Sequence, residues 1–216
     1  TARDLATLST RLMQDFPAYV GYYAIKKYRY PGTPAANDSN RNLLLFRDPT
    51  VDGLKTGHTD AAGFCLVATA QRDFPNLQGR RLLAIILGAA SENARAEEAQ
   101  KLLNWGYTAY DGIKLFEAGQ AVVTPAVFKG RQPQVGLGRN QAIVVAVPQG
   151  QAGNIKTMVT RPEPLLAPLQ KNQPVATLKV LLNQAPLVEI PLLALSAVEE
   201  AGFLGRTWDT LTLWLK

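Results

Sequence analysis

Apolar residues over positions 1–17 recur with the period of a helix. The apolar members of this segment lie mostly three or four residues apart: Leu5, Leu8, Leu12 and Met13. Residues at that spacing share one helical face. Thr1 can cap the first turn, and Pro17 cannot continue a helix. The pattern predicts a helix that begins after Thr1 and ends before Pro17.

The pattern then changes to a polar loop and a series of strands. Residues 21–42 begin with apolar and aromatic positions and end in a cluster of Pro, Gly, Asn and Asp, which predicts an extended segment leading into a loop. Three strand-like runs follow, over residues 53–59, 63–73 and 80–89, with turns at 60–63 and 75–79. We expect an antiparallel meander. A helix over 91–110, capped by Ser91, comes next.

The residue pattern of the chain changes again near Tyr110. Short runs rich in Val, Ile and Leu alternate with Gly and Pro over residues 121–130, 141–150, 155–162, 176–183 and 186–195. Short, regularly punctuated strands are typical of a small all-β domain, either a sandwich or a partial barrel. We therefore predict a first domain over 1–110 and a β-rich second domain over 111–198. The second domain has no cluster of groups suited to chemistry.

The last segment, residues 199–216, has a helical pattern of its own. Its apolar residues fall at i, i+4, i+7 and i+11: Leu204, Trp208, Leu211 and Leu215. These positions share one helical face. The simpler interpretation is a terminal helix packed on its own domain. The alternative is an amphipathic helix at a membrane surface, because Trp and Leu with few charges suit the headgroup boundary.

Composition and charge exclude several classes of function. The net charge of +6 is evenly spread, with 13 basic and 10 acidic residues in 1–110 and 10 and 7 in 111–216. No Lys/Arg run reaches five residues, so we expect no nucleic-acid partner. The lone cysteine, Cys65, lies in an apolar run and is expected to be buried. A single histidine, His58, argues against a metal site, and we expect neither metal nor cofactor.

The strongest chemical signal is the tripeptide Lys55-Thr56-Gly57, which lies on a predicted strand after an Asp-Gly turn signal. Alone it is consistent with an exposed hairpin edge. A strand edge of this kind also offers a cation, a hydroxyl and backbone N–H groups together. Such groups suit a carboxylate-bearing substrate whose main chain pairs like an added strand.

Lys-Thr-Gly is also the third motif of penicillin-binding proteins and serine β-lactamases. The longer run VDGLKTGHTDAAGFCLVATA (51–70) resembles D-alanyl-D-alanine carboxypeptidases of the low-molecular-mass penicillin-binding protein 5/6 type (peptidase family S11). KLLNWGY (101–107) and APLQKNQPVATL (167–178) resemble the same family, and residues 1–17 resemble the helix that follows its second motif. The resemblance covers essentially the whole chain. It includes the β domain, which favours the two-domain carboxypeptidases over single-domain β-lactamases.

This resemblance implies a fold and a set of roles. The fold would be a partial α/β serine β-lactamase/transpeptidase-like domain, an antiparallel sheet with helices, followed by a small all-β domain. Lys55 would raise the positive potential near the substrate carboxylate, Thr56 would hydrogen-bond that carboxylate, and Gly57 would let the substrate backbone approach. The backbone N–H of His58 matches the strand half of the family's oxyanion hole.

Two arginines match family positions near the same site. Arg41 matches one at the rim of the active site, and Arg95 matches one near the carboxylate pocket. The simpler alternative for both is a surface salt bridge. With Lys55, Thr56 and Gly57 they form the predicted substrate-binding set, for a peptidoglycan stem peptide or a β-lactam.

The chain departs from the family in one essential respect. The family's nucleophile lies in Ser-x-x-Lys, and none of Ser9, Ser39, Ser91 and Ser196 has a lysine three residues later. The one Ser-x-Asn triplet, at Ser91, follows the Lys-Thr-Gly motif instead of preceding it, so we interpret it as a helix cap. We expect this chain to be the C-terminal portion of a longer enzyme. The missing N-terminal segment would be the partner of this chain. It would have been cleaved and retained, would lie on another chain, or would be absent.

Three functions are therefore weighed. The first is part of a serine-type D-Ala-D-Ala carboxypeptidase that trims stem peptides through an acyl-enzyme, periplasmic and peripheral to the inner membrane of a bacterium through its C-terminal helix. The second is a non-catalytic binding or scaffold module of the same fold. The third, a serine β-lactamase, is disfavoured by the second domain.

Overall fold

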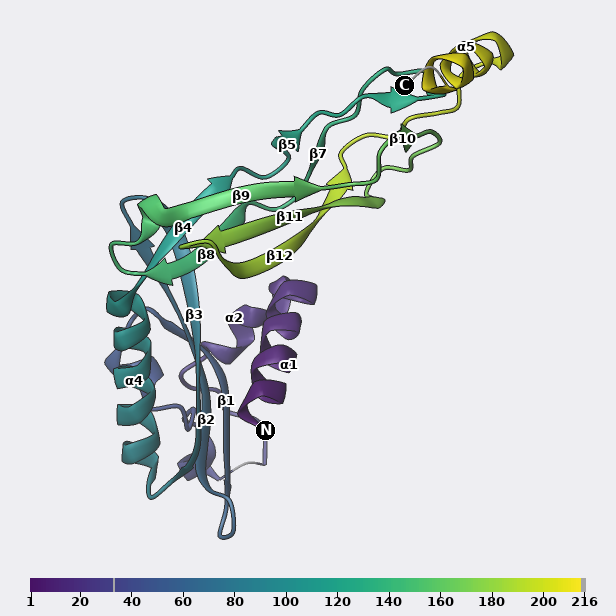
Figure 1. Cartoon of the computed structure of the whole chain (residues 1–216). Coiled ribbons are helices and arrows are strands. Elements are labelled where there is room, and N and C mark those ends of the chain that lie inside the picture. Colours follow the sequence, from purple (N-terminus) through teal and green to yellow (C-terminus); the bar gives the residue numbers. More distant parts are fainter. Residues whose placement is uncertain (33, 215–216) are drawn as a thin grey trace. The chain divides into compact units, whose positions relative to one another are not determined.

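The computed structural model describes residues 1–32 and 34–214, which divide into two compact units, Thr1–Tyr110 and Asp111–Lys216 (Figure 1). The first unit is an antiparallel sheet with helices, and the second is built mainly of strands. This architecture confirms the predicted fold class of an α/β domain followed by an all-β domain.

Three long strands form the sheet of the first unit in the order β1 (Val51–Thr59), β2 (Gly63–Phe74), β3 (Leu77–Ala89). Both pairs are antiparallel, as the meander prediction requires. The second turn is shorter than expected, because Phe74 already pairs with Leu77. Gly63 closes the first turn with a φ of +63°, a conformation in which a side chain would be strained.

The predicted helices begin and end close to the expected residues. In α1 (Ala2–Asp15), the Thr1 hydroxyl accepts a hydrogen bond from the Asp4 N–H, and the Asp4 carboxylate accepts from the Thr1 amino group. In α4 (Glu92–Ala109), the Ser91 hydroxyl accepts from the Ala94 N–H at 3.0 Å. These side chains satisfy backbone donors that the first helical turn leaves without partners.

The extended segment predicted after Pro17 is wrong at its start. The chain turns through Pro17–Tyr19 and forms the short helix α2 (Val20–Tyr23), and a second short helix, α3 (Leu44–Arg47), follows the polar loop. Ring contacts at a spacing of three residues accompany the first of these turns, because Tyr19 lies 6.4 Å from Phe16 and 6.1 Å from Tyr22. Such aromatic pairs stabilise a helical path where the apolar and aromatic residues suggested an extended segment.

Helix α4 packs along one face of the sheet, and α1 and α2 lie along the other (Figure 1). Four apolar or aromatic residues on the side of α4 that faces the sheet are buried, and two of them are alanines: Ala96, Ala99, Leu103 and Tyr107. The sheet presents residues of the same kind: Leu66, Ala68, Ala70 and Ala84. Small side chains on both surfaces let the helix axis approach the strands closely.

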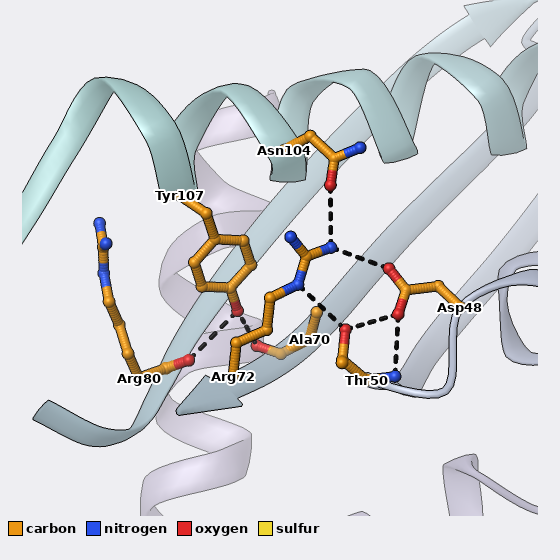
Figure 2. A network of polar contacts seen from close by, with 7 residues as sticks. All are labelled: Asp48, Thr50, Ala70, Arg72, Arg80, Asn104 and Tyr107. Atoms are coloured by element: carbon orange, nitrogen blue, oxygen red, sulfur yellow. Dashed lines mark hydrogen bonds and ion pairs between the residues drawn. The ribbon is translucent and has the colours of Figure 1, made fainter. Parts of the chain in front are cut away.

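The C-terminal end of α4 is fixed to the sheet by Tyr107 (Figure 2). Its buried hydroxyl donates to the Ala70 carbonyl of β2 at 2.7 Å and, more weakly, to the Arg80 carbonyl of β3 at 3.1 Å. Burial raises the pKa of the Tyr107 phenol, although nearby Arg72 and Arg80 oppose that shift. The hydroxyl therefore remains a protonated donor throughout the physiological pH range.

A charged network continues from this helix to the start of β1 (Figure 2). The Arg72 guanidinium donates to the Asp48 carboxylate and to the Asn104 side chain, both at 2.9 Å, and lies 4.3 Å from the centre of the Tyr107 ring. Burial alone would raise the pKa of Asp48. Hydrogen bonds from Thr50 and Arg72 outweigh that effect and lower it. The network ties β2, α4 and the loop before β1 together.

The second unit has its own hydrophobic core. Five strands form its main sheet in the order β5 (Ala121–Val123), β7 (Leu137–Gly138), β12 (Ala185–Ala194), β11 (Pro174–Leu182), β9 (Ile155–Thr160). Two further pairs are β4 (Tyr110–Phe116) with β8 (Ile143–Pro148) and β10 (Leu165–Leu166) with β6 (Val127–Phe128). Along β8, buried and exposed residues alternate, as expected for a strand with one face on a core.

The chain ends in helix α5 (Phe203–Trp214). Its Asp209 carboxylate accepts a hydrogen bond from the Lys129 backbone N–H, and Arg206 pairs with Glu200 at 3.0 Å. Among the residues predicted to form its apolar face, Trp208 and Leu211 are exposed, the Leu204 side chain is outside the description, and Leu215 lies outside the described residues. No helix in the described part of the chain is both long and apolar enough to cross a membrane.

The position of Tyr107 generates a stability prediction. Tyr107→Phe removes a buried hydroxyl that serves two strand carbonyls, so we expect the first unit to lose about 1–2 kcal/mol of unfolding free energy. Urea titration followed by tyrosine and tryptophan fluorescence measures the loss. Tyr22→Phe, at an exposed ring, is the matched control and should change nothing. Equal stability of the two variants would contradict the anchoring role of Tyr107.

Candidate functional site

The predicted motif lies on β1, an edge strand of the three-stranded sheet. Side chains alternate along a strand, so Lys55 and Gly57 share one face, and Thr56 and His58 share the other. Lys55, Gly57 and His58 are exposed and Thr56 is half-buried. The Lys55 ammonium donates to the Thr56 carbonyl of the same strand. The strand therefore presents a cation, a hydroxyl and backbone groups at a sheet edge.

Gly57 leaves open space above the strand. A Cβ at this position would meet only the Cβ of Cys65, at 3.8 Å, which is an ordinary contact. No crowding from within the sheet explains the glycine, so an approaching main chain could use the space. The expectation that Cys65 is buried is wrong, since it is only partly covered. It pairs with Gly57 across the strands, and a glycine has no side chain to cover it.

The His58 ring packs against its cross-strand neighbour. His58 pairs with Phe64 of β2, and their ring centres are 3.9 Å apart with the planes inclined by 27°. The imidazole thus has a packing role on the surface of the hairpin, while the backbone of His58 stays at the strand edge. Sequence reasoning did not single out Phe64, although its position opposite His58 follows from the hairpin register.

Arg95 lies beneath the strand, with only 2% of its surface exposed. Its guanidinium donates to the Gly57 carbonyl at 3.3 Å and to the Arg41 carbonyl at 2.9 Å, and it pairs with Glu92 at 3.2 Å. The simple surface salt bridge is therefore not the arrangement observed. One buried cation connects the first turn of α4, the motif strand and the loop that carries Arg41.

Arg41 itself is exposed, and two asparagines fix the loop around it. The Asn40 side chain donates to the carbonyls of Tyr23 and Ile25, at 3.3 and 3.1 Å. The Asn42 side chain, 2% exposed, donates to the Gly53 carbonyl of β1 at 2.9 Å and accepts from the Leu44 N–H at 3.1 Å. Sequence reasoning missed both, because turn-forming asparagines are common and their partners lie elsewhere in the chain.

The Ser-x-Asn triplet at Ser91 takes a structural position in this unit. The Ser91 hydroxyl caps α4, as its position at the start of the helix predicts. Within the described residues, no three His, Cys, Asp or Glu side chains come together in a way that could hold a metal ion. What the structure assembles is one wall: an open strand edge at 55–58, supported by Arg95 and bordered by Arg41.

Two family descriptions match the chain in succession. Residues 1–91 match the D-alanyl-D-alanine carboxypeptidase family (peptidase S11). Residues 110–200 match the penicillin-binding protein 5 C-terminal domain. The first match contains the whole open strand, and the second covers most of the β-rich unit.

Individual relatives agree with this division. The chain is 38% identical to D-alanyl-D-alanine carboxypeptidase DacC of Escherichia coli over 97% of its own length and 51% of the relative's. It is 32% identical to DacA of the same organism over 99% and 51% of the two lengths. The crystal structure of penicillin-binding protein 5 from Haemophilus influenzae aligns with a TM-score of 0.74 at 30% identity, covering 93% of this chain and 57% of that one. The chain thus spans about half the length of the curated relatives it matches.

The Asn42 clamp, formed by its side-chain hydrogen bonds with Gly53 and Leu44, generates a prediction about the loop that carries Arg41. Asn42→Ala leaves the buried Leu44 N–H and the Gly53 carbonyl without their side-chain partner, at an expected cost of about 1–3 kcal/mol. The Leu44 amide should exchange its hydrogen faster, as measured by amide exchange with NMR detection. Asn93→Ala, at an exposed residue that accepts from Arg47, is the control. If Leu44 exchanged equally in both variants, the clamp would not hold the loop.

Proposed function

Because the chain belongs to the D-alanyl-D-alanine carboxypeptidases of the penicillin-binding protein 5/6 type, we propose that it supplies the substrate-binding wall of a serine-type D-Ala-D-Ala carboxypeptidase. The substrate would be a peptidoglycan stem peptide that ends in D-Ala-D-Ala, and a β-lactam would occupy the same wall. Residues 1–110 would complete the catalytic domain, 111–198 would form the second domain, and 199–216 would begin a C-terminal amphipathic helix.

The observation that carries this proposal is the open edge of β1 with Lys55, Thr56 and Gly57 along it. An extended substrate can pair with such an edge through its main chain. Thr56 would donate to the terminal carboxylate, and the Lys55 ammonium would add positive potential beside it. Gly57 leaves room for the substrate backbone, and exposed Arg41 lies in the loop at the rim.

The nucleophile would come from a segment that this chain does not contain. No serine here has a lysine three residues later, and the chain spans about half of its relatives' length. Strand β3 forms the other edge of the described sheet. On β3 itself, Leu87 is 50% exposed. On α1, which contacts β3, Leu8 is 64% exposed. An additional strand and helix would cover this apolar surface, which a separate folded unit would otherwise leave open to water.

Titration of the isotope-labelled chain with acetyl-D-Ala-D-Ala tests the wall directly. We expect the amide signals of residues 55–59 to move reversibly, with no effect of acetyl-L-Ala-L-Ala. Thr56→Val should weaken binding about tenfold or more, since a hydrogen bond to a charged group contributes about 1.5–3 kcal/mol. Thr7→Val, on the exposed face of α1, is the control. The absence of any response at 55–59 would contradict the proposal.

Helix α5 would hold the protein to the outer surface of the bacterial inner membrane, in the periplasm. Its aromatic residues include Phe203, 76% exposed, and Trp214, 86% exposed, with Trp208 and Leu211 also exposed. Exposed Trp, Phe and Leu side chains on a short helix suit the boundary between lipid headgroups and acyl chains. Such attachment needs no membrane-spanning helix.

Vesicle flotation tests this attachment. We expect the unchanged chain to float with vesicles of phosphatidylethanolamine and phosphatidylglycerol, and a Phe203→Ser, Trp214→Ser double variant to remain largely in the dense fraction. Each aromatic side chain contributes about 1.5–3 kcal/mol when its apolar surface leaves water. Thr207→Ser on the same helix is the control. Equal flotation of the double variant and the control would exclude α5 as the membrane contact.

A further inference from the structure

The carbonyl and the N–H of the Gly57–His58 peptide face different surroundings. Its carbonyl, that of Gly57, accepts a hydrogen bond from the buried Arg95 guanidinium at 3.3 Å. In a trans peptide the N–H and the C=O point in opposite directions. The His58 N–H of this peptide therefore points away from Arg95. The N–H and C=O groups of a strand point sideways in the sheet. Since Arg95 belongs to the helix that packs on β2 and β3, the direction away from it is toward the open edge of β1.

The guanidinium is held in place by contacts on several sides. Besides Gly57, it donates to the Arg41 carbonyl at 2.9 Å and pairs with Glu92 at 3.2 Å. Its centre lies 5.6 Å from the centre of the Phe64 ring, and Phe64 stacks on the His58 ring at 3.9 Å. The Gly57–His58 peptide is thus held at its carbonyl by the Arg95 cation. The His58 side chain that follows it is held by stacking on Phe64.

We propose that Arg95 is a positioning residue that orients and polarises the Gly57–His58 peptide, so that the His58 N–H becomes a stronger hydrogen-bond donor at the substrate edge. A donor on the carbonyl of an amide increases the donor strength of its N–H, because hydrogen-bonded amides polarise one another. The donor here carries a full charge and is screened from water, which strengthens the effect.

The inference rests on the proposed function, together with the role that the family resemblance implies for the His58 N–H as one donor of the oxyanion hole in the acyl-transfer step. It assigns Arg95 a role different from direct contact with a substrate carboxylate. With 2% of its surface exposed and its donors directed at two backbone carbonyls and Glu92, the side chain acts through the strand. Arg41, which is exposed, remains the arginine able to meet a ligand.

The test uses the unliganded chain labelled with ¹³C and ¹⁵N, so it does not depend on activity or substrate. The chemical shifts of the Gly57 carbonyl carbon and the His58 amide proton report the polarisation of the peptide. In Arg95→Met we expect both to move upfield, by more than the Thr56 carbonyl or the Thr59 amide. Arg95→Lys, which keeps the charge, should retain part of both shifts.

The control is Arg47→Met, which removes another arginine that bonds at the same end of α4, to Asn93 at 2.6 Å. It should leave the Gly57 and His58 signals unchanged. A folded Arg95→Met variant with unaltered signals would overturn the proposal. If neither Arg95 variant folds, the unchanged chain decides the question. Scalar coupling across the hydrogen bond, between the Arg95 guanidinium nitrogen and the Gly57 carbonyl carbon, would support the proposal. Absence of this coupling would overturn it. Failure of the acetyl-D-Ala-D-Ala titration would instead count against the function alone.

Discussion

The close packing of α4 against the sheet is the constraint on which the candidate site depends. Alanines at 96 and 99 face alanines at 68, 70 and 84, so helix and strands approach closely. Tyr107 fixes the last turn of the helix to two strand carbonyls, and Arg95 in its first turn reaches the Gly57 carbonyl. A rigid helix held at both ends therefore sets the position of the motif strand, which is paired on one side only.

Much of this arrangement could be predicted from local sequence patterns. Strand-like runs and turn residues indicated the meander, and Thr1 and Ser91 indicated the helix starts, because these signals act between near neighbours. The short helix α2 was missed because its apolar and aromatic residues also suit an extended segment, and the ring contacts that accompany the turn are not visible in the sequence. The motif residues could be named, but the burial of Arg95 and the Asn42 clamp join residues 38 and 11 positions apart along the chain. Composition carries no information on such pairings.

The two units differ in the kind of surface that they present. The first brings charged and polar groups to an open strand edge, whereas the second buries a continuous apolar core and ends in a helix with exposed aromatic residues. This division agrees with the successive matches to a carboxypeptidase family and to a penicillin-binding protein C-terminal domain. In the proposed function, the strand edge at 55–58 would bind the substrate, and a serine outside this chain would perform the covalent step.

The central proposal is that this chain would recognise the ligand and that the nucleophile comes from elsewhere. Intact-mass measurement after incubation with penicillin tests it most directly, using the chain alone and the chain mixed with any co-purifying polypeptide. We predict that this chain keeps its 23.5 kDa mass. A penicillin adduct should form only on a second polypeptide that carries a Ser-x-x-Lys motif. A covalent adduct on any residue of this chain would contradict the account.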